Sequence, residues 1–179
     1  MQRRFFLEAA LAATIAPSAA FASGLRLERD GARFAVRAQV QIAAPRETAW
    51  ATLVDYEALP RFVPGMEASR IVSRSGTMVV VQQTGFVGFG PFTERFDTTL
   101  QVDEHRAERI DATAIAGDFD EFVASYELDV VDADATRLTY AARLRPRRAP
   151  PPLIGAMLMQ SVLQTRFDAM LAEIRQRAG

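Results

Sequence analysis

Residues 122–144, FVASYELDVVDADATRLTYAARL, contain two runs in which apolar and polar residues alternate, joined by a short acidic segment. The apolar members of the two runs are Phe122, Ala124, Tyr126, Leu128, Val130, Leu138, Tyr140, Ala142 and Leu144. Successive side chains of a β-strand point to opposite faces, so a period of two indicates a strand with one buried face. Asp132-Ala133-Asp134 supplies turn residues between the runs. The stretch therefore predicts an antiparallel hairpin with one face toward solvent.

The same alternation occurs in other parts of the chain. It is clearest in residues 33–42 and returns in residues 92–102. Residues 77–86 and 109–115 are further candidate strands, and residues 25–29 are a candidate leading strand. Turn-forming residues separate these segments at the spacing of hairpins. Repeated one-sided alternation predicts an antiparallel sheet with one wet face.

Two stretches have helical periodicity. A short helix is expected with Pro45 at its first position, followed by a brief turn at residues 55–59. A long helix is expected from about Pro152 to Gln176, where apolar residues recur every three or four positions. These residues are Met159, Leu163, Phe167, Met170 and Ile174. An antiparallel sheet with its helices on one side is an α+β domain, and the space between sheet and helix is where a ligand would bind.

Composition argues against several classes of function. All 21 basic residues are Arg and face 22 acidic residues, so the net charge of −1 gives no electrostatic reason to expect nucleic-acid binding. The absence of Cys removes disulfides, Cys-ligated metals and thiol nucleophiles, and a single His argues against a His-based triad or metal site. We expect neither a metal nor another cofactor.

The first 22 residues are typical of an export signal. Met1-Gln2-Arg3-Arg4 is a charged start, an apolar run follows, and Ala20-Phe21-Ala22 fits a small-residue cleavage site. Arg3-Arg4 with Phe6 and Leu7 is similar to a twin-arginine signal. The alternative is an uncleaved membrane anchor, although the apolar run is shorter than the ~20 residues that span a bilayer. We therefore expect a signal at residues 1–22, a single domain at 23–179 and a periplasmic location.

A set of short motifs extends over roughly residues 33–177. They are Ala44-Pro45, Ala49-Trp50, Asp55-Tyr56, Leu59-Pro60, Phe62-Val63-Pro64-Gly65, Gly88-Phe89-Gly90-Pro91-Phe92-Thr93-Glu94, Gly117-Asp118-Phe119 and a terminal helix with Phe167. In these positions the chain resembles the START-like, helix-grip superfamily, and within it the coenzyme Q-binding and polyketide cyclase branch. The resemblance implies a curved antiparallel sheet wrapped around a long C-terminal helix. It also implies a hydrophobic cavity that holds a lipid, quinone or polyketide without metal or covalent catalysis.

Alternation, helix periodicity and the glycine-rich loop together predict the residues that line this cavity. They are Phe86, Phe89, Phe92, Glu94, Phe96, Tyr126, Tyr140, Met159, Leu163 and Phe167. Glu94 would orient a polar head group or act as a general acid or base, or else it is a solvated carboxylate at a strand end. The two tyrosines would donate hydrogen bonds to a ligand, or else they are core residues whose hydroxyls are satisfied.

Two surface features are compatible with a role at a membrane. The loop at residues 85–91 carries two Phe between glycines, and it is either an apolar gate or membrane-dipping tip, or a hairpin with buried Phe. Arg143, Arg145, Arg147 and Arg148 precede an apolar helix start and would bind an anionic lipid surface, or else form a solvated turn. His105 falls in a predicted turn outside the cavity.

These observations favour an exported, monomeric carrier that shields a lipid or quinone in the cavity. The alternative is an enzyme, a polyketide cyclase or dehydratase, in which Glu94 and a tyrosine form an acid–base pair. A third hypothesis is an interaction module whose cavity is collapsed. We expect a small hydrophobic ligand, with peripheral membrane contact as a further hypothesis.

Overall fold

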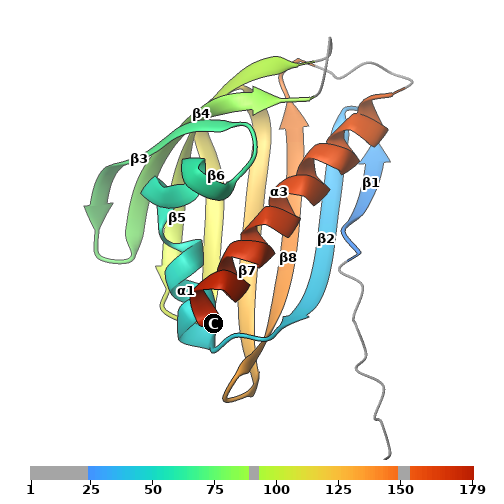
Figure 1. The fold of residues 1–179 in the computed structure, drawn as a ribbon. Coiled ribbons are helices and arrows are strands. Elements are labelled where there is room, and N and C mark those ends of the chain that lie inside the picture. The colour runs from blue at the N-terminus through green and yellow to red at the C-terminus, as the bar shows by residue number, and fades with distance from the viewer. Residues whose placement is uncertain (1–23, 89–92, 149–153) are drawn as a thin grey trace, which may run out of the picture.

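The computed structural model describes residues 24–88, 93–148 and 154–179. They form one eight-stranded antiparallel sheet in the order β1-β2-β8-β7-β6-β5-β4-β3. The strands are β1 (Arg26–Asp30), β2 (Arg33–Ile42), β3 (Met66–Ser75), β4 (Met78–Val87), β5 (Glu94–His105), β6 (Arg109–Gly117), β7 (Phe119–Asp132) and β8 (Ala135–Pro146). The helices are α1 (Arg46–Leu53), the 3-10 turn η1 (Tyr56–Ala58), α2 (Leu59–Phe62) and α3 (Gly155–Ala178). Figure 1 shows the long α3 crossing one face of the curved sheet, so the predicted α+β fold is confirmed.

The hairpin that the sequence predicts at residues 122–144 lies at the centre of the sheet. β7 and β8 pair with Tyr126 opposite Tyr140 and Ala124 opposite Ala142. β2 pairs with the other edge of β8. The strand at residues 33–42 has the predicted bounds, and its even-numbered residues from Phe34 to Ile42 are buried. The first long strand thus lies beside the last one.

Some element boundaries differ from the expectation. β3 was not predicted, because most of its side chains are exposed and the strand therefore lacks clear alternation at the edge of the sheet. Pro45 is the N-cap of α1 rather than its first residue, and its carbonyl accepts hydrogen bonds from the amides of Thr48 and Ala49. α3 begins at Gly155 rather than near Pro152, which lies outside the described residues.

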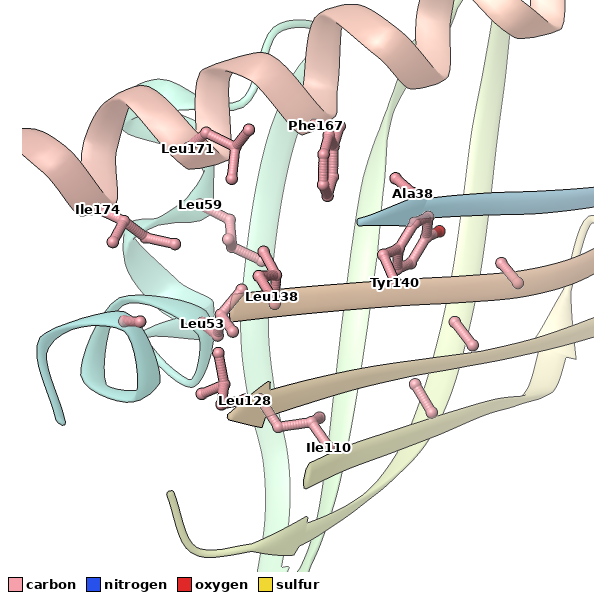
Figure 2. Packing of buried hydrophobic residues seen from close by; sticks show 14 of the residues in the cluster. Ala38, Leu53, Leu59, Ile110, Leu128, Leu138, Tyr140, Phe167, Leu171 and Ile174 are labelled. Atoms are coloured by element: carbon pink, nitrogen blue, oxygen red, sulfur yellow. The ribbon is translucent and has the colours of Figure 1, made fainter. Parts of the chain in front are cut away.

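The core is solid at one end of α3. Leu171 and Ile174, in the C-terminal half of the helix, are buried and face Leu53, Leu128 and Leu138 from the short helices and the sheet (Figure 2). Toward the other end, Met159 and Leu163 are only partly buried. The helix therefore packs more tightly around Leu171 and Ile174 than around Met159 and Leu163.

Polar contacts hold α3 at both sides of the sheet. Gln160 donates a hydrogen bond to the carbonyl of Leu25 at 2.6 Å, and the Leu25 amide donates to Gln164 at 3.3 Å. On the opposite side, Arg166 donates to the carbonyl of Phe86 at 2.9 Å. Arg177 at the C-terminal end pairs with Asp55 at 2.9 Å. Within the described ranges, no helix is long and apolar enough to cross a membrane.

Candidate functional site

Two adjoining pockets lie between α3 and the face of the sheet that it covers. The outer pocket has a volume of about 540 Å³ and the inner pocket about 200 Å³. Six residues line both pockets, which places them at the junction: Val87, Phe96, Phe119, Phe122, Leu163 and Arg166. A largely apolar concave space of this size between sheet and helix is the usual form of a small-molecule site.

The inner pocket is apolar, with few polar groups. Val81, Leu100 and Ile110 contribute to its sheet side, and Phe167 and Met170 to its helix side. The polar side chains that line it are Tyr56, Gln83, Thr98, Tyr126, Tyr140 and Arg166. Arg166 is the one charged residue among the described residues of this lining. An apolar ligand would gain free energy here mainly from surface burial, at about 25 cal/mol per Å².

The outer pocket is more polar and carries charges of both signs. Its charged lining residues are Glu94, Arg95, Asp97, Asp118, Arg148 and Arg166. Asp118 accepts a hydrogen bond from the amide of Asp97 at 2.8 Å, which ties the end of β6 to β5. Exposed residues such as Glu94, Arg95 and Asp97 line this pocket, whereas most of the inner lining is buried, so the outer pocket forms the mouth of the site and the inner pocket forms its end.

Seven of the residues predicted from the sequence line the pockets. Glu94 and Met159 line the outer pocket, Phe96 and Leu163 line both, and Tyr126, Tyr140 and Phe167 line the inner one. Glu94, expected to point inward, is an exposed residue at the start of β5, so it lies at the mouth.

Phe86 differs from the expectation, and two further predicted residues lie outside the part of the chain that the structure describes. The Phe86 side chain is 40% exposed and belongs to neither lining, because Val87 on the same strand lines both pockets and Phe86, one residue earlier, points to the other face. There it lies beside Arg95, whose guanidinium carbon is 5.9 Å from the ring centroid. Its backbone carbonyl, however, accepts a hydrogen bond from Arg166. Phe89 and Phe92, with most of the expected apolar loop, are outside the described residues.

The two predicted tyrosines form an aromatic stack with the helix. The Tyr126 and Tyr140 ring centroids are 4.7 Å apart, and Tyr140 stacks on Phe167 at 5.8 Å. Burial raises the pKa of Tyr126 to about 12 and holds the pKa of Tyr140 well above its ordinary value. Both phenols therefore stay protonated and can donate hydrogen bonds. Neither hydroxyl has a hydrogen-bond partner among the described residues, so both remain available to a ligand.

Arg166 is a functional candidate that the sequence reasoning missed. Its guanidinium carbon lies 5.0 Å from the Phe96 ring centroid, and its Nη2 donates to the Phe86 carbonyl. The Nε atom is buried without a hydrogen-bond partner, and burial lowers the pKa of the guanidinium. The signal was present in the sequence, because position 166 follows Leu163 by three residues and precedes Met170 by four, on the inward face of the helix.

Gly65 allows the Phe86 carbonyl to lie within reach of Arg166. Its backbone is in the left-handed region, at φ 75°, where a Cβ would be only 2.5 Å from the Phe86 oxygen. The Phe86 amide in turn donates to the Gly65 carbonyl at 2.6 Å. Only glycine accommodates both the backbone angle and this close approach.

Beside the inner pocket, Tyr56 is fixed by a polar contact. Its hydroxyl donates to Glu104 at 3.0 Å, and Arg74 donates two hydrogen bonds to the same carboxylate at 2.8 and 3.2 Å. Burial, together with the nearby Glu104 charge, raises the pKa of Tyr56. Unlike Tyr126 and Tyr140, Tyr56 has a satisfied hydroxyl. Its contact attaches η1 to the sheet and is structural.

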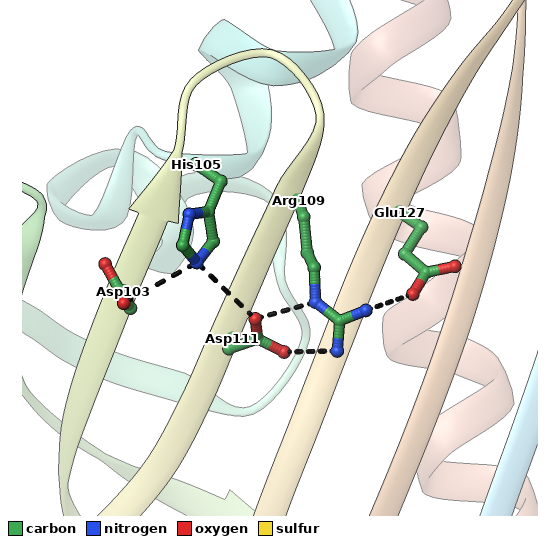
Figure 3. Close-up of polar contacts among 5 residues, drawn as sticks. All are labelled: Asp103, His105, Arg109, Asp111 and Glu127. Carbon is green, nitrogen blue, oxygen red and sulfur yellow. Dashed lines mark hydrogen bonds and ion pairs between the residues drawn. The ribbon is translucent and has the colours of Figure 1, made fainter.

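The single His lies in a polar cluster outside the pockets. Figure 3 shows His105 between Asp103 and Asp111, and Arg109 between Asp111 and Glu127. On β5 the residues from Phe96 to Val102 alternate inward, so Asp103 and His105 point away from α3. Among the residues that the structure describes, no group of His, Asp and Glu is arranged to hold a metal ion.

The basic segment before α3 is largely paired with acids. Arg143 lies 3.7 Å from Glu121, and Arg145 and Arg147 lie 3.4 and 3.6 Å from Asp120. These ion pairs reduce the net positive charge of the segment. Arg143 and Arg145 lie on β8 and only Arg147 and Arg148 follow it, so the expected turn is largely the end of a strand. Its ion pairs agree better with a solvated surface than with a lipid-binding patch.

Fold and site together define a helix-grip protein with a hydrophobic ligand pocket. The family described as polyketide cyclase / dehydrase and lipid transport matches residues 42–174, and the chain belongs to this family. No curated protein matches the chain.

Several solved structures share the fold. The Zhui aromatase/cyclase from Streptomyces sp. R1128 has a TM-score of 0.68 at 19% identity, covering 82% of this chain and 93% of that one. A START superfamily protein from Mycobacterium smegmatis has a TM-score of 0.67 at 17% identity, with coverage of 79% and 97%. A fragment of the STAR-related lipid transfer protein from Xanthomonas axonopodis has a TM-score of 0.66 at 16% identity, covering 86% of this chain and 99% of that one. The resemblance found in the sequence is thereby confirmed at the level of family and fold.

Proposed function

We propose that this protein is a monomeric, exported carrier that binds a lipid or quinone in the pockets between α3 and the sheet. The observation that carries the proposal is the inner pocket, which is lined by apolar side chains and by two tyrosine hydroxyls that no described residue satisfies. Apolar burial would provide most of the affinity, and the hydroxyls would orient one polar group of the ligand. Family membership supports the same class of ligand.

A pair of Ala→Leu variants tests whether the inner pocket is the binding site. Ala124 lines the inner pocket, so its replacement by Leu puts additional carbon atoms into that space. Ala141, on the neighbouring strand β8, lies between the buried Tyr140 and Ala142 and so faces the opposite side of the sheet. Titration of an apolar fluorescent probe should show saturable binding that Ala124→Leu weakens and Ala141→Leu preserves. Equal affinity in all three proteins would contradict the assignment, provided that thermal melting shows both variants folded.

The second candidate function is a cyclase or dehydratase, which the family description and the fold of the Zhui aromatase/cyclase favour. The geometry gives it less support, because Glu94 lines the outer pocket whereas Tyr126 and Tyr140 line the inner one. Glu94→Gln separates the two functions. A carrier keeps its ligand occupancy in this variant, whereas an enzyme of this kind loses turnover and still binds.

The export proposal is supported by residues 1–22, with their Arg3-Arg4 pair and small-residue cleavage site. Replacing both arginines by Lys should leave the protein in the cytoplasm of a host with a twin-arginine pathway. Cell fractionation and the N-terminal sequence of the exported protein provide the measurement. Unchanged export of the double variant would contradict the twin-arginine assignment, and a retained N-terminus in the membrane fraction would indicate the anchor.

A further inference from the structure

Arg166 lies at the junction of the two pockets, and the described lining of the inner pocket contains no acidic residue. Among the described residues it forms no ion pair, and its one hydrogen bond is to the Phe86 carbonyl. Its Nε is buried and unpartnered. A guanidinium has five N–H donors, so most of its hydrogen-bonding capacity is unused. A charged group that is partly removed from water without a partner lowers stability, so a site that keeps one needs a reason.

The segments outside the described ranges contain few acidic residues. Residues 89–92 are Phe-Gly-Pro-Phe and residues 149–153 are Ala-Pro-Pro-Pro-Leu, so neither segment contains a carboxylate side chain. Before residue 24 the one acidic residue is Glu8, which lies in the expected export signal. Glu94, Asp97 and Asp118 line the outer pocket, but none of the described acids forms an ion pair with Arg166, so we look to a bound molecule for the negative charge that pairs with it.

The surroundings of Arg166 determine what kind of molecule fits. The inner pocket is apolar and has no other charged residue in its described lining, so it suits an uncharged hydrophobic body. The outer pocket carries three acids, Glu94, Asp97 and Asp118, which together match the charge of its three arginines, Arg95, Arg148 and Arg166, so it holds no excess positive charge that would attract an anion farther out. Arg166 lines both spaces, and the Tyr140 hydroxyl supplies a second donor in the inner one.

We propose that the ligand is an apolar molecule with one carboxylate, which pairs with Arg166 at the pocket junction while the apolar body lies in the inner pocket. The inference rests on the proposed carrier function and narrows its ligand class from lipids and quinones in general to apolar acids. Guanidinium and carboxylate groups have matching planar geometry, and two parallel N–H···O bonds can form between them. The hydrogen bond to the Phe86 carbonyl holds the guanidinium in place, so less side-chain entropy is lost on binding.

Two probes with the same alkyl chain test the carboxylate directly. Dodecanoate and 1-dodecanol are titrated calorimetrically into the purified protein after removal of bound lipid. The wild-type protein should bind dodecanoate more tightly than dodecanol. Arg166→Met keeps a long apolar stem and removes the charge, so it should weaken dodecanoate binding by about 10–100-fold, the range expected for hydrogen bonds to a charged group. Its affinity for dodecanol should remain unchanged.

Two further variants control for charge and folding. Arg175→Met removes an exposed arginine from the same helix and should change neither affinity. Arg166→Lys keeps the positive charge without the planar fork and should bind dodecanoate with an intermediate affinity. Thermal melting of each ligand-free variant reports folding, and Arg166→Lys provides the test if Arg166→Met does not fold.

The outcomes distinguish this inference from the proposed function. If the wild-type protein binds both probes equally, or Arg166→Met keeps full dodecanoate affinity, the carboxylate assignment is overturned while the carrier function stands. If the wild-type protein binds neither probe, both are overturned. Preference for dodecanoate that depends on Arg166 and not on Arg175 supports the assignment.

Discussion

Replacement of Gly65 by Ala tests whether the contact between Gly65 and Phe86 is as close as the structure indicates. A non-glycine residue in the left-handed region costs about 1–2 kcal/mol. The added Cβ also meets the Phe86 oxygen at 2.5 Å, and because that atom belongs to the backbone the strand itself must shift. Forced contacts of this kind cost about 1–3 kcal/mol. Reduced chain entropy in the unfolded state offsets about 0.4–1 kcal/mol. The expected net loss of unfolding free energy is about 1–4.5 kcal/mol.

Gly31→Ala is the matched control for this prediction. Gly31 also has a left-handed backbone, at φ 60°, but nothing lies within 4 Å of the position of its Cβ. It should therefore lose only about 0–1.5 kcal/mol, from the conformational terms alone. Urea denaturation followed by circular dichroism measures both variants. For a chain of this size the Gly65→Ala loss corresponds to roughly 2–18 °C in Tm. Equal destabilisation of the two variants would refute the contact, because it would mean that the Phe86 carbonyl moves away without cost.

Three further predictions concern the core, the tyrosines and the basic segment. Leu171→Ala removes a side chain that is 1% exposed and should lower the free energy of unfolding by about 3–5 kcal/mol. Met157 is exposed on the same helix, so Met157→Ala should change this free energy by no more than about 0.5 kcal/mol. Similar urea midpoints for the two variants would contradict the packing. All three tyrosines of the chain have raised pKa values because they are buried, so absorbance at 295 nm should show no tyrosine ionising near pH 10 while the protein is folded. The unfolded phenols ionise near that pH, so the free energy of unfolding should fall as the pH rises from about 10 toward 12. A tyrosine that titrates near pH 10 in the folded protein would contradict the burial. Replacing Arg143, Arg145, Arg147 and Arg148 by Gln should leave sedimentation with anionic liposomes unchanged, because the first three are ion-paired; a clear loss would restore the lipid-docking hypothesis.

Alternation along the strands predicted the antiparallel sheet, although not its edge strand β3. In β2 and in the β7–β8 hairpin one face is buried and the other is wet, so the period of two is visible in the residues themselves. β3 shows the limit of this reasoning. It is an edge strand with most side chains exposed, and backbone pairing with β4 defines it, which leaves no pattern of apolar residues to read.

The candidate site was predictable in its apolar part and not in its charged part. Periodicity placed Leu163 and Phe167 on the inward face of α3, and alternation placed Phe96, Tyr126 and Tyr140 on the inward face of the sheet. Arg166 was missed because the prediction of the inward face of α3 used only the recurring apolar residues, and Arg166 is a cation on that same face. Whether that cation is paired depends on which acids the fold brings near it, and this is a property of the tertiary structure rather than of residue spacing.

The presence of a carried ligand is tested most directly by mass spectrometry of an organic extract. The protein is purified gently from the periplasm of a host close to its native one, and the extract is compared with that of the Ala124→Leu variant. The expected result is a small apolar molecule at about one per chain in the wild-type protein and much less in the variant. An extract from well-folded wild-type protein that contains no such molecule above background would contradict the carrier function.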